Sequence, residues 1–337
     1  MSGEDRSLAF LEDVLAGPRE LGAVVHAQRE AIRDIPLGAL SRPTLRFIGM
    51  GSSRFAAMDA ASRLRALGRD AHAETASSSS FSTGGRDTLV VAISASGRTP
   101  EVLDAAERHR GTSFVLGLTA RPDSPLARYA DAVLPLAAAC KETAGVACLT
   151  YRATVAALIG LTGNDEPDIV PQTLAGAAVE LEELLSGRRS WVDRAADVFD
   201  GVRAVHVLAD GARLGAAEQA SLMLREAPRL AATAFDTGDW LHVGLYTLFP
   251  GDPVLLFGGA AADDAALRTI RDRGGRIVTV GPVRSEVAAD VAIPLPAAAV
   301  ANRYVRALVE SAVAELIAAE LWRRTSAGQV GQGTAPA

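Results

Sequence analysis

Lysine is almost absent from this sequence of 337 residues, in which Lys141 is the only one and arginine takes its place. An imine between a protein and a carbonyl compound needs a lysine amine, so this scarcity limits the chemistry that the chain could perform. Cysteine is scarce as well. Cys140 and Cys148 are too few for a disulfide framework and lack the spacing of metal ligands, which predicts no metal site and a reducing, cytoplasmic location.

Long apolar runs and an excess of positive charge are also missing. No run is long enough to span a bilayer, and residues 1–10, MSGEDRSLAF, lack the basic and apolar regions of a signal peptide. The formal net charge of −6 argues against a surface for nucleic acid or for an anionic membrane. The remaining composition, with 49% hydrophobic and 22% charged residues, is typical of a soluble globular protein long enough for two domains.

The most informative stretch covers residues 87–106, DTLVVAISASGRTPEVLDAA. Residues 88–93 form an apolar run without polar alternation, which predicts a strand buried on both faces of a parallel sheet. The turn SASGRT follows, and Pro100 then suits the first position of a helix capped by Thr99. Hydroxyls and free backbone N–H groups at a helix N-terminus favour an anion, although an ordinary strand-to-helix turn with a good cap would look the same.

A second stretch of this kind lies upstream. Residues 45–48 predict another buried strand, which leads through GMGSS at residues 49–53 into a helix that ends near Gly68. Both turns follow the carboxyl ends of strands. They can therefore converge on one ligand at the point where a parallel sheet reverses its strand order.

Four segments in this order resemble a known family. GMGSS, ISASGRT, LTARPDSPLARYADAVLPL and ETAGVAC together resemble the first sugar isomerase (SIS) domain in the isomerase half of glucosamine-6-phosphate synthase. In that family the two hydroxyl-rich turns hold the sugar phosphate. The resemblance therefore implies a phosphosugar ligand, whose binding residues here would be Gly51, Ser52, Ser53, Ser94, Ala95, Ser96, Thr99 and Cys148.

Cys148 departs from the family pattern, because the family has serine at this place in its GVAS turn near the sugar. We expect the thiol to pack rather than to react.

The rest of the chain fits an α/β architecture. Five strands with interleaved helices are predicted in the first half, at residues 45–48, 70–75, 88–93, 113–118 and 132–136. The second half repeats this pattern with strands at residues 204–208, 254–257, 276–280 and 291–293. With the resemblance, the expected fold is two tandem SIS domains, each a flavodoxin-like, doubly wound parallel sheet of five strands flanked by helices.

The expected domain limits are a first SIS domain with N-terminal helices at 1–165, a helical connector at 166–200, a second SIS domain at 201–325 and a disordered tail at 326–337. We expect two helical pieces broken at Gly17-Pro18, one helix over 145–161 and a closing helix over 298–322. The glycine-containing turn at 209–213 has no serine, so the second domain is expected to bind no phosphate of its own.

Two residues of the second half are candidates for catalysis. Glu226 ends a helix that resembles the family's IALEGALKLKE helix, and the resemblance makes it the base that moves a proton between C1 and C2 of the sugar. His242 matches the histidine that helps to open the sugar ring and that is contributed across a homodimer interface. The plainer alternatives are a solvated charge at a helix end and a histidine packed between Leu241 and Val243.

The departures from the family limit the reactions that the chain could catalyse. Met223 stands where the synthase has a lysine, the synthase's C-terminal lysine has no counterpart, and no glutaminase domain is found. We therefore expect a phosphosugar isomerase-type enzyme, catalysing aldose–ketose isomerisation or the isomerising removal of an amine, with no metal or organic cofactor. The alternative is a noncatalytic sugar-phosphate sensor, although no helix-turn-helix segment or basic arm supports a DNA-binding version.

Overall fold

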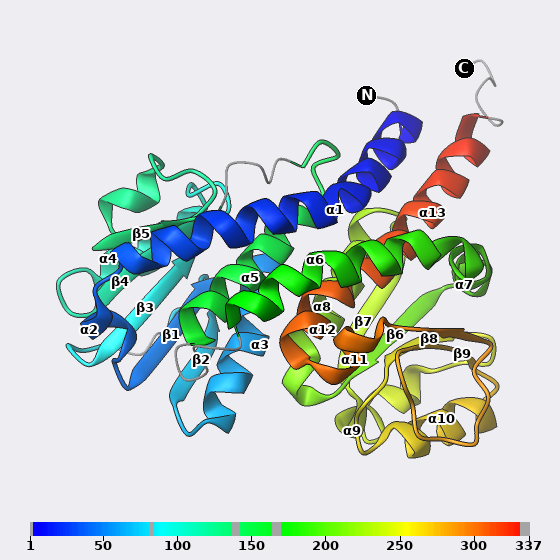
Figure 1. The fold of residues 1–337 in the computed structure, drawn as a ribbon. Coiled ribbons are helices and arrows are strands. Elements are labelled where there is room, and N and C mark those ends of the chain that lie inside the picture. Colours follow the sequence, from blue (N-terminus) through cyan, green and yellow to red (C-terminus); the bar gives the residue numbers. More distant parts are fainter. Residues whose placement is uncertain (1–2, 81–83, 137–141, 164–169, 331–337) are drawn as a thin grey trace. The chain divides into compact units, whose positions relative to one another are not determined.

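The computed structural model describes residues 3–80, 84–136, 142–163 and 170–330 (Figure 1). The chain divides into two compact units, each built on one sheet. The first-sheet unit comprises Pro18–Lys141 and Leu149–Ala178, and the second-sheet unit comprises Met1–Gly17, Glu142–Cys148 and Val179–Ala337. The sequence-based limits had assigned residues 1–17 and 142–148 to the first domain, whereas here they group with the second sheet.

The first-sheet unit holds five parallel strands in the order β2-β1-β3-β4-β5. Their bounds are Thr44–Gly49 (β1), Asp70–Thr75 (β2), Thr88–Ile93 (β3), Phe114–Thr119 (β4) and Ala132–Pro135 (β5), close to the predicted ranges. All six residues of β3 are buried, as expected for the central strand of a sheet that is covered on both faces.

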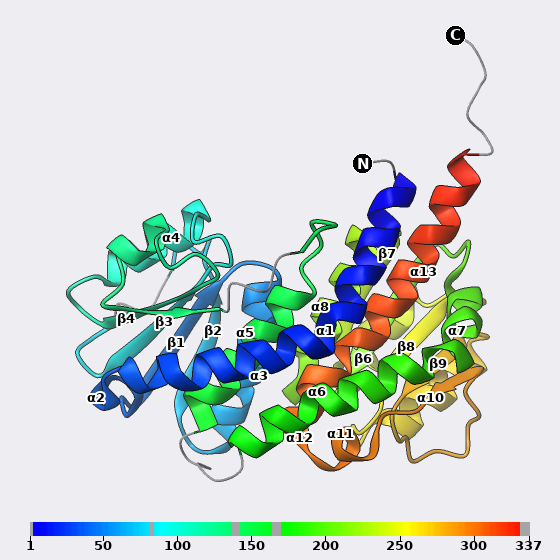
Figure 2. The same ribbon diagram turned by 45° about the horizontal axis from the view of Figure 1, so that its top comes forward.

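The helices of this unit are α2 (Leu37–Leu40), α3 (Ser52–Ala66), α4 (Pro100–His109) and α5 (Leu149–Thr162), with 3-10 turns η1 (Ile32–Asp34) and η2 (Pro125–Arg128). Right-handed crossovers from β1 to β2 and from β3 to β4 place α3 and α4 on opposite faces of the sheet (Figure 2). Helix α5 packs against α3.

The second-sheet unit repeats the topology, with the order β10-β9-β8-β6-β7. The strands are Ala204–Ala209 (β6), Ala231–Asp236 (β7), Pro253–Phe257 (β8), Arg276–Val280 (β9) and Val291–Ile293 (β10). Strand β7 was not located from the sequence. It is an edge strand with only one fully buried residue, so it lacks the apolar run that marks the central strands.

The helices of this unit are α7 (Val192–Phe199), α8 (Leu214–Glu226), α9 (Thr237–Trp240), α10 (Asp263–Asp272), α11 (Ala297–Ala301), α12 (Arg303–Val309) and α13 (Ser311–Val330), with η4 (Arg188–Ser190), η5 (Gly211–Arg213) and η6 (Gly244–Thr247). Helices α8 and α10 cover opposite faces of the sheet (Figure 1). Helix α13 packs on α7 and α8.

Three helix predictions were wrong in detail. Helix α1 (Gly3–Ala31) is continuous, with Pro18 inside it, where two pieces had been expected. Helix α5 begins at Leu149 instead of residue 145, because Gly145 has a φ of 76°, outside the helical region. The closing helix is three helices, since Asn302 ends α11 and its side chain accepts the N–H groups that begin α12.

The predicted connector and tail fall partly inside the described residues. Helix α6 (Val170–Gly187) and α7 supply the two expected connector helices. The disordered tail was expected from residue 326, but α13 continues to Val330, and residues 331–337 lie outside the described part of the chain. Among the described residues, no helix combines the length and apolar character needed to cross a membrane.

Candidate functional site

The turn between β1 and α3 presents hydroxyls at the start of a helix. Gly51 has a φ of 49°, which favours glycine, and helix α3 begins at the next residue. No side chain caps this helix. Among the described residues, the hydroxyls of Ser52 and Ser53 have no hydrogen-bond partner within the protein. The turn therefore has donors available for an external acceptor.

The turn between β3 and α4 is fixed by hydrogen bonds of its own side chains. The Ser94 hydroxyl is buried and lies 2.8 Å from the Thr99 hydroxyl. Thr99 occupies the N-cap position, as predicted, but its hydroxyl pairs with Ser94 and does not cap the helix. Ser96 is exposed, and its hydroxyl accepts the Arg98 N–H at 3.2 Å. The side chain of Ala95 adds no bulk.

Two backbone N–H groups of this turn are also available to a ligand. Within the described residues, no protein acceptor bonds the N–H groups of Ser96 and Thr99. Two unpaired N–H groups and nearby hydroxyls at the N-terminus of α4 form a set of donors that suits a phosphate.

The segment that carries Cys148 is fixed within the second-sheet unit. The Asp13 carboxylate accepts the Thr143 and Ala144 N–H groups at 2.8 and 3.1 Å, and the Gln219 amide donates to the Ala147 carbonyl at 3.0 Å. Cys148 is fully buried. This burial agrees with the expected packing role and is unfavourable for a reactive thiol.

Glu226 is the last residue of α8 and is half-buried. Burial raises the pKa of its carboxyl above the ordinary value, and the charges of Arg229 and Arg225 offset this only in part. Among the described residues, no side chain or backbone group hydrogen-bonds this carboxylate. A carboxyl with a raised pKa and free oxygens has the properties of a general base.

His242 follows α9 in a segment that is held in place by a buried side chain. Trp240 is fully buried and its indole donates to Nδ1 of His206 at 2.8 Å. Burial lowers the pKa of His206, which keeps this ring neutral and able to accept. Gly244 has no room for a side chain because Trp240 fills that space. His242 itself is exposed, so the alternative of a packed histidine does not hold.

The second sheet has a turn in the place equivalent to that between β3 and α4, and its donors are already used. The Asp263 carboxylate accepts the N–H groups of Gly259 and Ala260 at 2.6 and 3.0 Å. Beside it, Arg213 and Arg306 both bond the fully buried Glu310 carboxylate, at 2.9 and 2.8 Å. Here the protein's own carboxylates take the place of an anionic ligand.

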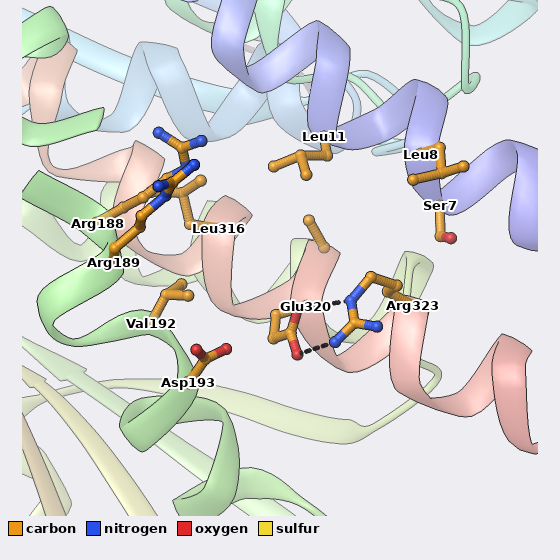
Figure 3. Close-up of a pocket in the computed structure, with 11 residues that line it drawn as sticks. Ser7, Leu8, Leu11, Arg188, Arg189, Val192, Asp193, Leu316, Glu320 and Arg323 are labelled. Atoms are coloured by element: carbon orange, nitrogen blue, oxygen red, sulfur yellow. Dashed lines mark hydrogen bonds and ion pairs between the residues drawn. The ribbon is translucent and has the colours of Figure 1, made fainter. Parts of the chain in front are cut away.

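A separate cavity of about 170 Å³ lies in the second-sheet unit among α1, α7 and α13 (Figure 3). Leu11 and Leu316 lie on its apolar side, and Glu320 and Arg323 pair with each other at 2.7 Å (Figure 3). None of the residues predicted for the site lines it. We therefore do not assign this cavity to the site.

The predicted site residues fall into two sets. The first-sheet unit holds the seven phosphate candidates, Gly51, Ser52, Ser53, Ser94, Ala95, Ser96 and Thr99, at the carboxyl ends of the adjacent strands β1 and β3. Cys148, Glu226 and His242 belong to the second-sheet unit. Across the described residues, no group of three His, Cys, Asp or Glu side chains could hold a metal ion.

Several residues around the site were not identified from the sequence. Asp13, Gln219, His206 and Trp240 hold the segments that carry the candidates, and each bonds a partner more than 30 positions away. Such pairs leave no local pattern. Only the lone tryptophan in the segment FDTGDWLH could have indicated an anchor.

Comparison with known proteins agrees with this geometry. Residues 41–162 match the SIS domain model. Over 237 residues the chain is 28% identical to glutamine–fructose-6-phosphate aminotransferase [isomerizing] of Pyrobaculum aerophilum, covering 63% of this chain and 37% of that protein. The chain thus spans little more than a third of this curated relative.

Two solved structures share the fold along nearly the whole chain. Tagatose-6-phosphate ketose/aldose isomerase of Escherichia coli has a TM-score of 0.77 at 19% identity, covering 97% of this chain and 94% of that one. Glucosamine-6-phosphate deaminase of Thermotoga maritima has a TM-score of 0.71 at 16% identity, covering 97% and 96%. The β1–α3 and β3–α4 turns both lie within the matched family segment. Residues 41–162 of this chain are therefore a SIS domain.

Proposed function

We propose that this chain is a phosphosugar isomerase-type enzyme with two tandem SIS domains. The first would bind the sugar phosphate, and the second would supply the groups that move protons. The reaction would be aldose–ketose isomerisation, or the isomerising removal of an amine from an aminosugar or fructosamine phosphate. The second SIS domain rests on the repeated strand order of the second sheet.

The phosphate assignment is supported by the donors of the two turns in the first-sheet unit. Ser52, Ser53 and Ser96 can donate hydroxyl protons, and the N-termini of α3 and α4 add backbone N–H groups and favourable dipoles. Hydrogen bonds to an ionised group are stronger than those between neutral groups. A phosphate held in this way would fix one end of the sugar.

The environment of Glu226 is the observation that favours an enzyme over a simple binding protein. Moving a proton from C2 of an aldose to C1 needs one base that removes and returns it, through an enediol. A carboxylate with a raised pKa and no protein partner is suited to both steps. His242 would assist ring opening, because an imidazole can give and take a proton near neutral pH.

We further propose that His242 acts in the partner subunit of a homodimer. The segment around it exposes an unusual number of large apolar side chains: Val243, Tyr246 and Phe249 are 51, 72 and 51% exposed. Exposed apolar side chains gathered on one segment indicate a surface that another protein covers. A second copy of the chain is the occupant that the shared site requires.

A sugar-phosphate sensor is the second candidate. Met223 is fully buried in α8 at the place of the synthase lysine, so this helix has lost one polar group of the catalytic pattern. A sensor would keep the phosphate turns and lose proton transfer.

Deuterium exchange separates the two functions. Phosphosugars that raise the melting temperature of the protein are incubated with it in D₂O, and NMR follows deuterium at C1 and C2. We expect exchange with the unmodified chain and its loss, by about a hundred- to ten-thousand-fold, in Glu226→Gln. The same variant should keep ligand binding, since glutamine keeps the size of the side chain.

Glu218→Gln is the matched control, because Glu218 lies two turns earlier on α8 and is 4.0 Å from Arg225. It should exchange deuterium at the unmodified rate. If the unmodified protein exchanges no deuterium with any phosphosugar that it binds, the sensor replaces the enzyme.

A further inference from the structure

A depression of about 610 Å³ adjoins the β3–α4 turn within the first-sheet unit. One wall is formed by Ser96 and Arg98 of that turn. The other is formed by the loop after β4, including Arg121, Asp123 and Ser124. Ser96 thus belongs both to this depression and to the candidate phosphate site.

The two walls are held together by backbone contacts. The Ala95 carbonyl accepts the Ala120 N–H at 3.1 Å and the Thr119 hydroxyl at 3.2 Å. The Gly97 carbonyl accepts the Leu126 N–H at 3.2 Å. Hydrogen bonds of the β3–α4 turn itself therefore fix both walls of the depression, at the carboxyl end of the sheet.

Ser124 supplies a buried donor without a partner. Its side chain is 4% exposed, and its hydroxyl oxygen has no hydrogen-bond partner in the protein. It precedes η2 in the cap position, yet it caps no N–H group of that turn. The hydroxyl lies over Gly97, which has a φ of 62° and no room for a side chain at that point. A buried hydroxyl without a partner is unfavourable, and a ligand acceptor would remove this cost.

The charge around the depression is positive. Arg98 and Arg121 are both exposed, and within the described residues neither forms an ion pair. Asp123 is the one carboxylate on the lining. Two guanidinium groups and one carboxylate leave a net positive site beside a free hydroxyl donor, which is the combination that binds a carboxylate or phosphate.

We propose that this depression is a second anion subsite, so that the ligand carries a second anionic group besides the phosphate bound at the β3–α4 turn. The substrate class is then a phosphosugar with a further phosphate or a carboxylate. Arg121 and Arg98 would pair with that group, and Ser124 would donate to it. This inference rests on the proposed function, because it takes the first phosphate to lie at the turn.

Calorimetric titration of the full chain tests this with three sugars. Fructose 6-phosphate carries one anionic group, fructose 1,6-bisphosphate carries two phosphates, and 6-phosphogluconate carries a phosphate and a carboxylate. We expect at least one of the two doubly anionic sugars to bind tenfold or more tightly than fructose 6-phosphate. Which of them does so distinguishes phosphate from carboxylate.

Arg121→Ala and Ser124→Ala should each reduce this advantage. Arg121→Ala should weaken binding of the doubly anionic sugar at least tenfold more than it weakens binding of fructose 6-phosphate. Arg110→Ala is the control, because it removes an exposed arginine of the same unit away from the depression and should change no affinity. Equal binding of all three sugars, or an advantage that survives both variants, overturns the second subsite and leaves the proposed function intact. Binding of none of the three overturns both.

Discussion

At the scale of single residues, the hydroxyls of the β3–α4 turn have different roles. Ser94 is buried and pairs with Thr99, so its hydroxyl holds the turn in shape. Ser96 is exposed and accepts only one local N–H, so its hydroxyl proton is free for a ligand. The sequence predicted both as binding residues, since a run of letters does not show which hydroxyl faces inward.

Ser96→Ala should weaken fructose 6-phosphate binding with little change in stability. A hydrogen bond to a charged group contributes about 1.5–3 kcal/mol, which corresponds to roughly a ten- to hundred-fold loss of affinity. The exposed hydroxyl adds little to folding. Calorimetry and thermal melting measure the two quantities. Ser41→Ala, which removes an exposed hydroxyl that bonds Gly38, is the control, and unchanged affinity in Ser96→Ala would show that the phosphate lies elsewhere.

Glu226→Gln should stabilise the protein at neutral pH. Burial raises the pKa of this carboxyl above its ordinary 4.5, so the ionised form costs the folded state free energy. That cost is fully present above the folded pKa and vanishes as the pH falls below about 4.5. The variant should therefore melt at a higher temperature than the unmodified protein at pH 7 to 8, and the difference should shrink on acidification.

Thermal melts between pH 4 and pH 8 measure this difference. Glu286→Gln, which removes an exposed carboxylate, is the comparison and should change the melting temperature little. A melting temperature of Glu226→Gln that is lower at every pH would mean that Glu226 holds the structure and is not a strained base.

At the scale of elements, segment 142–148 depends on one carboxylate. Asp13 is 4% exposed and accepts three hydrogen bonds, from the N–H groups of Thr143 and Ala144 and from the Thr143 hydroxyl. Without it, the buried Ala144 N–H would lose its acceptor. Phe10, three residues earlier on α1, packs against Trp322 of α13 with ring centroids 6.1 Å apart, which fixes the helix that carries Asp13.

Asp13→Ala should therefore destabilise the second-sheet unit. The buried Ala144 N–H left unpaired costs about 1–3 kcal/mol, so the melting temperature should fall by several degrees. Glu12→Ala, on the same helix with an exposed side chain, should leave it nearly unchanged. Equal effects of the two variants would show that segment 142–148 has another anchor.

The elements that the sequence predicted well are those with strong local signals. Buried central strands such as β3 and helices that follow glycine-containing turns were located within a few residues. Strand β7 and the break at Asn302 were missed, because an edge strand of alanines has no distinct period and a single asparagine cap interrupts an otherwise helical stretch. Pro18 was read as a break but is tolerated inside α1.

At the scale of the whole molecule, the exposed apolar segment after His242 predicts a homodimer. Sedimentation at micromolar concentration should give twice the chain mass, because Val243, Tyr246 and Phe249 would otherwise remain in water. Tyr246→Glu should dissociate the dimer and reduce the rate of deuterium exchange together with it. Leu67→Glu alters another exposed apolar residue, 45% exposed, and should do neither. A fully active monomer would remove the shared site.

The two sheets have the same strand order and end in turns of opposite chemistry. Asp263 and Glu310 already supply the negative charge in the second, so that half completes its own electrostatics during folding. Within its described residues the first half has donors without protein acceptors, so under the proposed function a bound anion would add to its stability. Ligand concentration is then a thermodynamic variable for one half of the chain only, since a ligand stabilises just the folded state that binds it. Metabolite levels would set how firmly that half is folded, and so how long the protein persists when its substrate is scarce.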